Sequence, residues 1–480
     1  MDMNELPTEA VRKSPLAALR SFVAISVGKT LLHLSRLLGL GSGSSLPGLV
    51  ALKIDPDLVL KMSSAFKDGV VVITGTNGKT TSANQLRAIL KRAGMRVVHN
   101  HTGSNLMRGI ASILIERSTP FGKPKGDIGL FEVDEATMPA AAEQLQPKII
   151  LVTNIFRDQL DRYGELDKTA QVIAEAIGQL DDVTIFLNAD DPLVAGMSRA
   201  AERKRAAGVL FFGLESRGAH FGPTASIDSF KCPACDSELQ FDKRFYGHLG
   251  SYRCEDCGFQ KPKPDYKAAD IVLWGIEGST FELISGEERL TITTNLPGLH
   301  NVYNSLASCA LALHLGIDGE VVTSALAEST AVFGRTEQLL IDGTRIFLML
   351  VKNPIGLTQT INTAAPLARN YLMILNDNFA DGMDVSWIWD GDFSALVEDF
   401  NFIYASGLRA ADMALRLKYE GLDVSKVKIV SSIESAFKRA IKDTPDGEPL
   451  FVLATYSAMF QLRSSLARKG KSPSIWRTAP

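Results

Sequence analysis

The stretch Val71–Thr81 has the sequence VVITGTNGKTT, a β-branched run followed by two glycines, a lysine and two threonines. The β-branched run predicts a buried strand, and residues 81–94 have the apolar spacing of a helix. A glycine turn between a strand and a helix is typical of a phosphate-binding loop, because its backbone amides and the N-terminus of the helix attract anions. The stretch therefore predicts a nucleotide site early in the chain.

The side chains of this loop suit a nucleoside triphosphate. The two glycines let backbone amides approach phosphate oxygens, Lys79 can reach the β- and γ-phosphates, and Thr80 or Thr81 can coordinate Mg²⁺. Ile73 replaces the first glycine of the general pattern G-x-x-x-x-G-K-[ST], so a plain glycine turn is the alternative. The predicted phosphate-binding residues are Gly75, Thr76, Asn77, Gly78, Lys79, Thr80 and Thr81.

The rest of the chain alternates apolar strand patterns with segments of helical length. This alternation predicts an α/β fold on a mostly parallel sheet with helices on both faces, followed by a second, Rossmann-like α/β unit. We expect an N-terminal amphipathic helix and linker (1–45), a central P-loop ATPase domain (46–320), a polar insertion within it (229–264) and a C-terminal α/β domain (325–480).

Composition narrows the class of protein. With 480 residues, 45% of them hydrophobic and 22% charged, the chain is long enough for several hydrophobic cores. A formal net charge of −3 provides no basic field for a nucleic-acid backbone, so we expect no nucleic-acid partner.

The N-terminal segment, residues 14–40, is apolar but interrupted by basic residues, Arg20 and Lys29 among them. Its longest uncharged run, residues 21–28, is well short of the roughly 18 residues that a spanning helix needs, and no signal-peptide cleavage site is evident. Leucines at near-helical spacing indicate an amphipathic helix. A helix docked on its own domain is favoured, and a helix lying on a bilayer surface is the alternative.

Four of the five cysteines form two close pairs, Cys232-x₂-Cys235 and Cys254-x₂-Cys257. This spacing predicts a Cys₄ zinc ribbon with a structural role, because a closed four-thiolate site leaves no position for water. Whether the ribbon also contacts a partner stays open. The fifth cysteine, Cys309, is expected to be a buried, unreactive thiol on an apolar helix. Metal-type spacing favours a reducing compartment, hence the cytoplasm.

The loop TGTNGKTT resembles that of the Mur ligase and folylpolyglutamate synthase superfamily, whose members use ATP to convert a carboxylate into an acyl phosphate and join it to an amine. Further segments match the family in order. By this resemblance Glu132 in LFEVDE holds Mg²⁺, Asn304 in LHNVYNSLAS contacts adenine, and Arg335 in FGRTEQ contacts the phosphates. A carboxylate at the C-terminal end of a parallel strand also faces the same crevice as the loop.

Two features of that superfamily are not matched in this sequence. The carbamylated lysine that holds a second Mg²⁺ in many Mur ligases is not located, and Asp158 and Asp161 are the candidate ligands for such an ion. The segment after the arginine departs from the family pattern as LMLVKNPIG, which contains Lys352.

The chain resembles MurT subunits of lipid II isoglutaminyl synthase more closely, over about residues 50–460. The shared stretches are GTNGKTT, FRDQLDRYGE, LNADDP, the Cys₄ ribbon, KNPIG and LNDNFADGMDVSWIWDGDF. In that family the subunit activates the D-glutamate α-carboxylate of the lipid II stem peptide, and a separate glutaminase, GatD, delivers ammonia. The resemblance thus implies ATP, Mg²⁺ and a structural Zn²⁺, a GatD-type partner, and lipid II at the inner membrane surface as the substrate.

Residues 377–392 contain five aspartates and two tryptophans. A solvated loop is the usual meaning of such a run, but Trp387 and Trp389 are costly on an exposed loop and indicate a docking surface. By the resemblance to MurT, Asp384 reaches across the interface and orients the histidine of the glutaminase, since a carboxylate on the far ring nitrogen fixes the tautomer. The predicted catalytic residues are Asp384, Glu132 and Lys79.

Three other functions compete with this hypothesis. A stand-alone Mur or folylpolyglutamate-type ligase would add an amino acid instead of ammonia. A zinc-ribbon nucleic-acid-binding ATPase is disfavoured by the acidic net charge, and a nucleotide-gated scaffold would bind ATP without forming ADP. The chain offers no spare cysteine for glutamine hydrolysis, which favours an amidotransferase made of two subunits.

Overall fold

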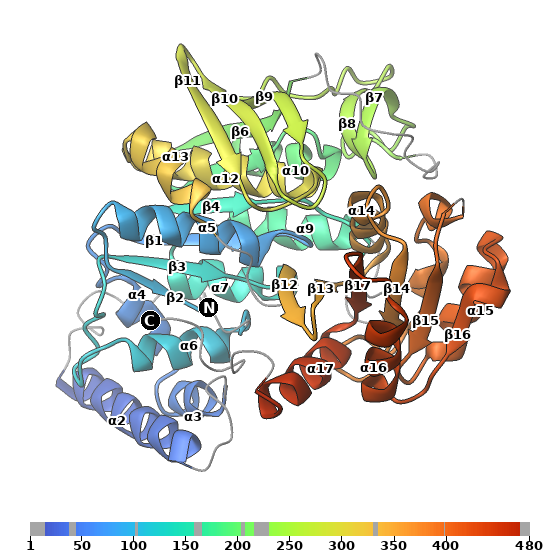
Figure 1. Ribbon diagram of the computed structural model, residues 1–480. Helices are drawn as coiled ribbons and strands as arrows, with labels where there is room; N and C mark the ends of the chain where they lie inside the picture. Colours follow the sequence, from blue (N-terminus) through green and yellow to red (C-terminus); the bar gives the residue numbers. More distant parts are fainter. Residues whose placement is uncertain are drawn as a thin grey trace.

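The computed structural model describes residues 15–37, 45–100, 104–157, 166–202, 207–215, 230–329, 335–397 and 399–470. Within them, a large sheet and a smaller sheet stand side by side, and the chain passes from the first to the second once (Figure 1). The predicted alternation of strands and helices around mostly parallel sheets is confirmed.

The large sheet has the strand order β11-β10-β9-β6-β5-β4-β1-β3-β2. Its strands are β1 (Val70–Thr74), β2 (Val97–His99), β3 (Ile128–Glu132), β4 (Ile149–Val152), β5 (Thr184–Asn188), β6 (Gly208–Leu214), β9 (Tyr266–Leu273), β10 (Ser279–Ser285) and β11 (Glu288–Thr294). In this sheet β2, β3, β1, β4, β5, β6 and β9 pair with their neighbours in parallel, whereas β9, β10 and β11 form an antiparallel meander. Val71 and Ile73 of β1 enter one core and Val70 and Val72 the other, which explains the unbroken apolar run.

Helices cover both faces of this sheet. One face carries α5 (Lys79–Arg92), α12 (Leu299–His314) and α13 (Gly319–Ala327). The other face carries α4 (Leu58–Ser63), α6 (Met107–Glu116), α7 (Met138–Leu145), α9 (Leu166–Ile177), α10 (Pro192–Gly196) and α11 (Ser198–Glu202), with α3 (Leu46–Ile54) beyond them. A short 3₁₀ turn, η1 (Glu135–Thr137), follows β3. The C-terminal ends of the parallel strands are thereby left as one edge at which loops gather.

The smaller sheet has the order β12-β13-β17-β14-β15-β16 and is parallel except for the pair β12–β13. Its strands are β12 (Arg335–Ile341), β13 (Thr344–Leu350), β14 (Asn370–Ile374), β15 (Phe402–Ser406), β16 (Val427–Ile429) and β17 (Pro449–Ala454). Helices α14 (Pro354–Ala364) and α15 (Ala410–Glu420) cover one face, and α16 (Ile433–Asp443) and α17 (Tyr456–Arg468) cover the other. Three 3₁₀ turns, η2 (Ser386–Trp389), η3 (Ser394–Leu396) and η4 (Val424–Lys426), lie in its connections.

The predicted insertion contains a separate hairpin of β7 (Gln240–Tyr246) and β8 (Leu249–Arg253). The hairpin stands beside the β9–β11 meander, on the side of the molecule that faces α14 (Figure 1). Its two flanking turns, closed by the bridges Lys231–Glu238 and Arg253–Gln260, carry the four paired cysteines.

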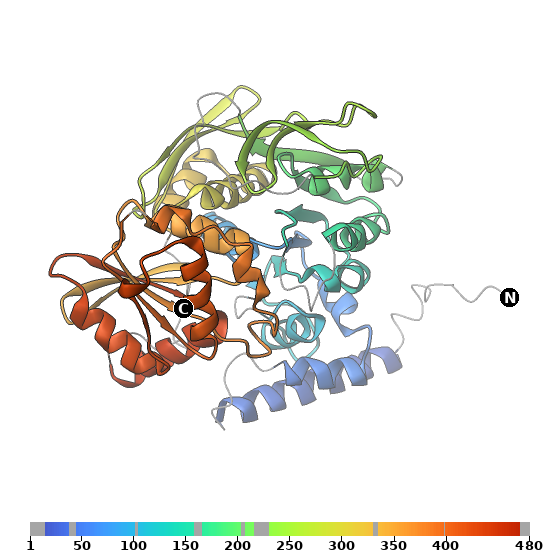
Figure 2. The same ribbon diagram turned by 90° about the vertical axis from the view of Figure 1, so that its right-hand side faces the viewer.

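The N-terminal helix α2 (Pro15–Leu37) lies along one edge of the molecule and packs on α3 and α6 (Figures 1 and 2). By length and composition alone, Leu16–Ser35 could cross a membrane, because Arg20 and Lys29 are its only fully charged residues. The sequence argument excluded a span because those charges interrupt the apolar run. One face of α2 is buried in the core of the large unit, which favours a helix that belongs to the folded domain, as predicted. A single helix of this length and composition is weak evidence for a membrane span.

Candidate functional site

The glycine loop connects the C-terminal end of β1 to the first turn of α5. Gly75 has φ 116° and Gly78 has φ 91°, a region that residues with a Cβ rarely adopt. A Cβ at Gly75 would collide with the hydroxyl of Thr153, and one at Gly78 with the carboxamide of Asn304. Both glycines are therefore required by conformation and by space, and Asn304, predicted to contact adenine, lies directly against the loop.

The segment after β4 holds the loop in place. Asn154 accepts from the backbone N–H of Asn77 at 2.9 Å and donates to its carbonyl at 3.0 Å. The hydroxyl of Thr76 bonds the backbone of Phe156, accepting from its N–H at 3.0 Å. The loop conformation is thus fixed by protein contacts before any phosphate binds, which lowers the cost of ordering it around a ligand.

Lys79, the first residue of α5, points toward the connection after β3. Its ammonium lies 3.0 Å from a carboxylate oxygen of Glu135 and donates to the carbonyl of Gly75. Both side chains are nearly buried, with 11% exposed for Lys79 and 6% for Glu135. Glu135 was not identified from the sequence, although it stands only three residues beyond Glu132 in LFEVDE.

The two predicted magnesium ligands face each other. The Thr80 hydroxyl donates to Glu132 Oε2 at 2.7 Å, and Asn100 fixes the backbone of Glu132 with bonds of 2.9 and 2.8 Å. His99 Nε2 lies 3.8 Å from the other Glu132 oxygen, while its Nδ1 donates to the Leu130 carbonyl at 2.9 Å. That bond leaves Nε2 as the ring nitrogen directed at Glu132.

Chemically, this corner suits a hard divalent cation. The carboxylates of Glu132, Asp134 and Glu135 are each less than a tenth exposed, and a buried carboxylate is costly unless a cation or hydrogen bonds compensate it. Hydroxyl and carboxylate oxygens are the ligands that Mg²⁺ prefers. The residues present therefore fit Mg²⁺, which Thr80 and Glu132 would hold.

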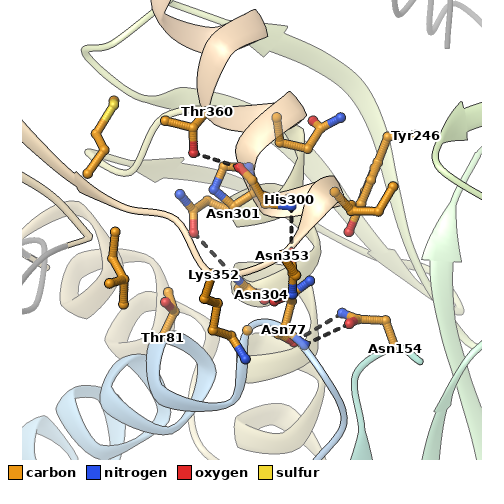
Figure 3. Close-up of a pocket in the computed structure, with 16 residues that line it drawn as sticks. Asn77, Thr81, Asn154, Tyr246, His300, Asn301, Asn304, Lys352, Asn353 and Thr360 are labelled. Atoms are coloured by element: carbon orange, nitrogen blue, oxygen red, sulfur yellow. Dashed lines mark hydrogen bonds between the residues drawn. The ribbon is translucent and has the colours of Figure 1, made fainter. Parts of the chain in front are cut away.

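Beside the loop lies a pocket with a cavity volume of about 110 Å³ (Figure 3). Residues from both sheets and from the ribbon line it. They include Asn77, Gly78, Thr81, Asn154, Tyr246, His300, Asn301, Asn304, Lys352, Asn353 and Thr360. The pocket adjoins the phosphate loop, and its amide and imidazole groups can form hydrogen bonds with the base and sugar of a nucleotide.

The C-terminal unit closes one wall of this pocket. Lys352 extends from the end of β13 toward the start of α5 (Figure 3). The neighbouring Asn353 is fully buried, donates to Asn77 Oδ1 at 3.0 Å and caps α14 by accepting from Gly356 N at 2.8 Å. The segment that departs from the superfamily pattern thus still meets the glycine loop.

The ribbon hairpin forms another wall. Tyr246 lines the pocket, with its ring centroid 5.6 Å from that of Tyr303 on α12 and 5.6 Å from that of Phe156. A Cβ at the turn residue Gly247 would meet the Phe156 ring at 2.9 Å and Ile355 of the C-terminal unit at 3.2 Å. The ribbon is therefore packed against the pocket as well as against its own sheet.

The four paired cysteines come together at the far end of that hairpin. All four sulfurs lie within 4.8 Å of one another, with Cys232 to Cys257 at 3.6 Å and Cys235 to Cys254 at 3.5 Å. Zinc–sulfur bonds of about 2.3 Å place the sulfurs of a tetrahedral site about 3.8 Å apart, so the cluster fits a tetrahedral metal. The hydroxyl and backbone N–H of Ser237 lower the pKa of Cys235 to about 6, which favours its thiolate, whereas burial raises the pKa of Cys232 to about 12.

The remaining predicted residues are less completely described. Arg335 begins β12, where its backbone pairs with Met349, but its side chain lies outside what the structure describes. Asp158 and Asp161 also lie outside the described residues. Cys309 is buried on α12 as expected, and burial raises the pKa of its thiol.

The aspartates of the acidic loop after β14 have different environments. Asp381 is 3% exposed and accepts from the N–H of Ser457 at 2.6 Å, so it joins the loop to α17. Asp384 is partly exposed and accepts from Ser386 N at 2.8 Å. The loop is therefore more ordered by internal contacts than a solvated acidic run would be.

The expectation that both tryptophans form a docking surface is wrong for one of them. Trp387 is 6% exposed and belongs to the core between α14, α15 and the smaller sheet, because the turn η2 directs it inward. Trp389 is 46% exposed and lies edge-on to Tyr419, with ring centroids 5.6 Å apart. Other exposed apolar residues of the C-terminal unit are Phe379 and Met383 in the same loop, Leu408 after β15, and Leu415 and Tyr419 on α15.

Comparison with known proteins supports the fold. The family model of the Mur ligase middle domain matches residues 73–235. Among solved structures, a pseudomurein peptide ligase type C from Methanothermus fervidus has a TM-score of 0.64 at 23% identity over 83% of this chain and 78% of that chain. A MurF from Acinetobacter baumannii has a TM-score of 0.63 at 18% identity over 87% and 80%. Fold, loop and family model together define an ATP-dependent ligase of the Mur ligase class.

Sequence relatives specify the class further. The family model described as MurT ligase C-terminal matches residues 350–459. The MurT subunit of a glutamine-hydrolyzing lipid II isoglutaminyl synthase from Streptococcus pneumoniae is 36% identical over 439 residues, covering 90% of this chain and 94% of the relative. Its counterpart from Staphylococcus aureus is 31% identical, covering 94% and 98%. The chain belongs to the MurT family.

Proposed function

We propose that this chain is the ligase subunit that amidates the D-glutamate α-carboxylate of the lipid II stem peptide to D-isoglutamine, with ammonia supplied by a GatD-type glutaminase. The names of its relatives, subunits of a glutamine-hydrolyzing lipid II isoglutaminyl synthase, support the substrate and the need for a partner. The observation that carries the proposal is the hydrogen bond between Thr80 and Glu132, beside Lys79 and at the edge of the nucleotide pocket.

A carboxylate does not react with ammonia unaided, because its oxygen is a poor leaving group. Transfer of the γ-phosphoryl group of ATP to a carboxylate oxygen gives an acyl phosphate and ADP. Ammonia then attacks the acyl carbon, the bond from that carbon to the phosphate oxygen breaks, and phosphate leaves as the nitrogen loses a proton. Pocket residues must therefore stabilise charge on the moving phosphoryl group and hold both ends of the reaction in line.

The residues divide this work. Lys79 and Arg335 offset charge on the β- and γ-phosphates, and the loop amides from Gly75 to Thr81 hold the phosphate chain. Asn304, with its neighbours on α12, binds the adenine. Thr80 and Glu132 hold Mg²⁺, which supplies further charge neutralisation when bound.

Zn²⁺ occupies the cluster of Cys232, Cys235, Cys254 and Cys257 in this proposal. Four thiolates fill its coordination sphere, so the site is structural. Because the hairpin between the cysteine pairs supplies Tyr246 to the pocket, the metal maintains the wall of the nucleotide site.

The glutaminase has to be another protein. Glutamine hydrolysis of the cysteine type needs an accessible thiol beside a histidine. Of the five cysteines, four form the cluster and Cys309 is buried, so no accessible thiol is left for that reaction. The exposed pair of Trp389 and Tyr419 forms part of the docking surface for that subunit, and Asp384 reaches its histidine.

Domain boundaries and a cellular location are part of the proposal. Residues 1–45 form the N-terminal helix and linker, 46–320 the central ATPase domain with the ribbon at 229–264, and 325–480 the C-terminal domain. The enzyme acts in the cytoplasm at the inner face of the membrane, where lipid II is made available to it.

The decisive experiment combines the purified chain with candidate glutaminases and follows the mass of lipid II by mass spectrometry. The expected product has one hydroxyl replaced by an amino group and requires ATP, glutamine and both proteins. When glutamine and the glutaminase are both left out, added ammonium chloride should still give the product. A product heavier by one amino-acid residue would instead identify a stand-alone ligase, and ATP binding without ADP under every condition would identify a scaffold.

A further inference from the structure

Helix α2 is apolar on two opposite faces. Ala24, Ile25 and Leu32 are buried against α3 and α6. The outward stripe consists of residues three, four or seven positions apart, or multiples of these, which share one side of a helix. Its exposed members are Leu16 (80%), Leu19 (59%), Val23 (42%), Leu34 (47%) and Leu37 (71%). An ordinary surface helix has a polar face in that place.

The apolar surface continues from α2 onto the turn that follows α6. Phe121 is 85% exposed, and its ring centroid lies 5.7 Å from that of Phe22 on α2. Figure 2 shows that α2 runs along an outer edge of the molecule, and the exposed members of the stripe lie toward its two ends. An exposed apolar surface joined across two elements marks an interaction site more often than chance exposure does.

Basic residues flank this surface, and they repel one another. Lys29 donates to the carbonyl of Ser118 at 2.6 Å, and its pKa is lowered by partial burial and by nearby Lys125, against a smaller opposing effect of Glu116. Arg117 and Lys125 are both exposed in the turn after α6, where the N–H of Lys125 donates to the carbonyl of Arg117. The lowered pKa of Lys29 means that an anionic neighbour would stabilise its charged form.

We propose that the outward stripe of α2, together with Phe121 and the adjoining basic residues, docks the enzyme on the surface of an anionic bilayer. The buried inner face keeps α2 parallel to the membrane, with the leucines entering the headgroup region and the cations meeting lipid phosphates. This inference deepens the proposed function, on which it rests for the lipid-linked substrate. Its geometric basis is independent of that substrate.

A second copy of the chain is the other possible occupant, and charge argues against it. A symmetric pairing through α2 would bring the basic groups around Lys29, Lys125 and Arg117 of both copies toward each other. One helical stripe with two phenylalanines also offers less apolar area than a stable dimer usually buries. A bilayer supplies both the apolar volume and the negative charge.

The test is co-sedimentation of the full-length chain with lipid vesicles, using phosphatidylcholine with phosphatidylglycerol and, in parallel, phosphatidylcholine alone. We expect binding to the anionic vesicles that weakens as salt is raised. The pair Leu19→Gln/Leu34→Gln should weaken it roughly tenfold by removing apolar contacts. The pair Arg117→Gln/Lys125→Gln should weaken it roughly fivefold for each charge removed. The matched control is Leu340→Gln/Leu367→Gln, which changes two exposed leucines of the C-terminal unit and should bind as the wild type does.

Three outcomes would overturn the inference: no binding of the wild type to either vesicle, equal losses in the control and in the α2 pair, or a dimer in analytical ultracentrifugation that the α2 pair dissociates. Circular dichroism checks that each variant is folded. If the leucine variant misfolds, the charge variant still tests the inference, because its two substitutions lie outside α2. Amidation of a water-soluble stem peptide without a lipid tail separates the two proposals. If vesicle binding holds while that amidation fails, the proposed function is wrong and the docking surface stands.

Discussion

The glycine loop after β1 and the acidic loop after β14 occupy similar places, each following an interior strand of a parallel sheet, yet their residues are fixed in different ways. In the glycine loop the backbone is bound by Asn154 and Phe156, and the polar side chains converge on one corner. In the acidic loop each aspartate has its own partner, such as Ser457 for Asp381 or Ser386 for Asp384.

This difference determines whether the role of each residue in a motif can be inferred from the sequence. The glycine loop is restricted to one conformation, because its glycines have positive φ and a strand precedes it. The directions of the Lys79 and Thr80 side chains therefore follow from their positions in the sequence. The second loop obtains its shape from distant segments, so sequence alone does not tell a buried aspartate from an exposed one.

Lys79→Ala should have the largest effect. Removing the ammonium leaves the charge on the transferring phosphoryl group uncompensated at a nearly buried position, so ATP-dependent turnover should fall by about a thousandfold or more. The measurement is ADP release in the presence of substrate and ammonia. Lys168→Ala, an exposed lysine on α9, should leave ADP release unchanged. Unaltered turnover in Lys79→Ala would remove the glycine loop from the mechanism.

Trp387→Ala and Trp389→Ala should separate core from surface in the acidic loop. Truncation of the buried Trp387 creates a cavity, so the free energy of unfolding should decrease by about 3–5 kcal/mol. Truncation of the half-exposed Trp389 should change it by less than about 1 kcal/mol but weaken glutaminase binding by about 2 kcal/mol. Denaturant unfolding and calorimetric titration with the glutaminase give the two quantities. Equal effects of both variants on unfolding would contradict the assignment.

Asp384→Asn should uncouple the two chemical activities. Asparagine keeps an oxygen for the N–H of Ser386 but loses the charge that steadies a histidine cation across the interface, so glutamine-dependent amidation should fall about a hundredfold. Amidation with added ammonium chloride should continue, because the ATP site is untouched. Asp390→Asn, at a half-exposed aspartate 3.4 Å from Arg157, is the matched control and should keep both activities. Loss of the ammonia-dependent reaction in Asp384→Asn would point to a structural role instead.

Sequence predicted the features that local chain geometry determines. The α/β fold followed from the alternation of apolar runs. Glu132 was identified by the resemblance to Mur ligases, and its hydrogen bond with Thr80 agrees with parallel strands that end at one edge. The spacing of the cysteine pairs was enough to place four sulfurs together. In each of these cases the decisive contacts are between short segments of regular structure.

The features that were missed depend on packing between distant segments. Glu135 reaches Lys79 only because η1 turns the chain back after β3, and Tyr246 reaches the pocket only because the ribbon hairpin folds over α12. The inward direction of Trp387 and the second apolar face of α2 likewise depend on what covers them. A residue pattern records that a side chain is apolar or charged, but not which neighbour it meets.

Asn353→Ser gives the smallest expected effect and tests the contact between the two units. Serine is a good helix N-cap, so α14 keeps the bond to Gly356 N, but its side chain is too short to reach Asn77. Loss of one hydrogen bond of about 1 kcal/mol should weaken ATP binding roughly fivefold, with unfolding nearly unchanged. Asn353→Ala loses both bonds and should additionally lower the unfolding midpoint. If the serine variant binds ATP as the wild type does while the alanine variant is destabilised, Asn353 only caps α14, and the glycine loop is held entirely by its own unit.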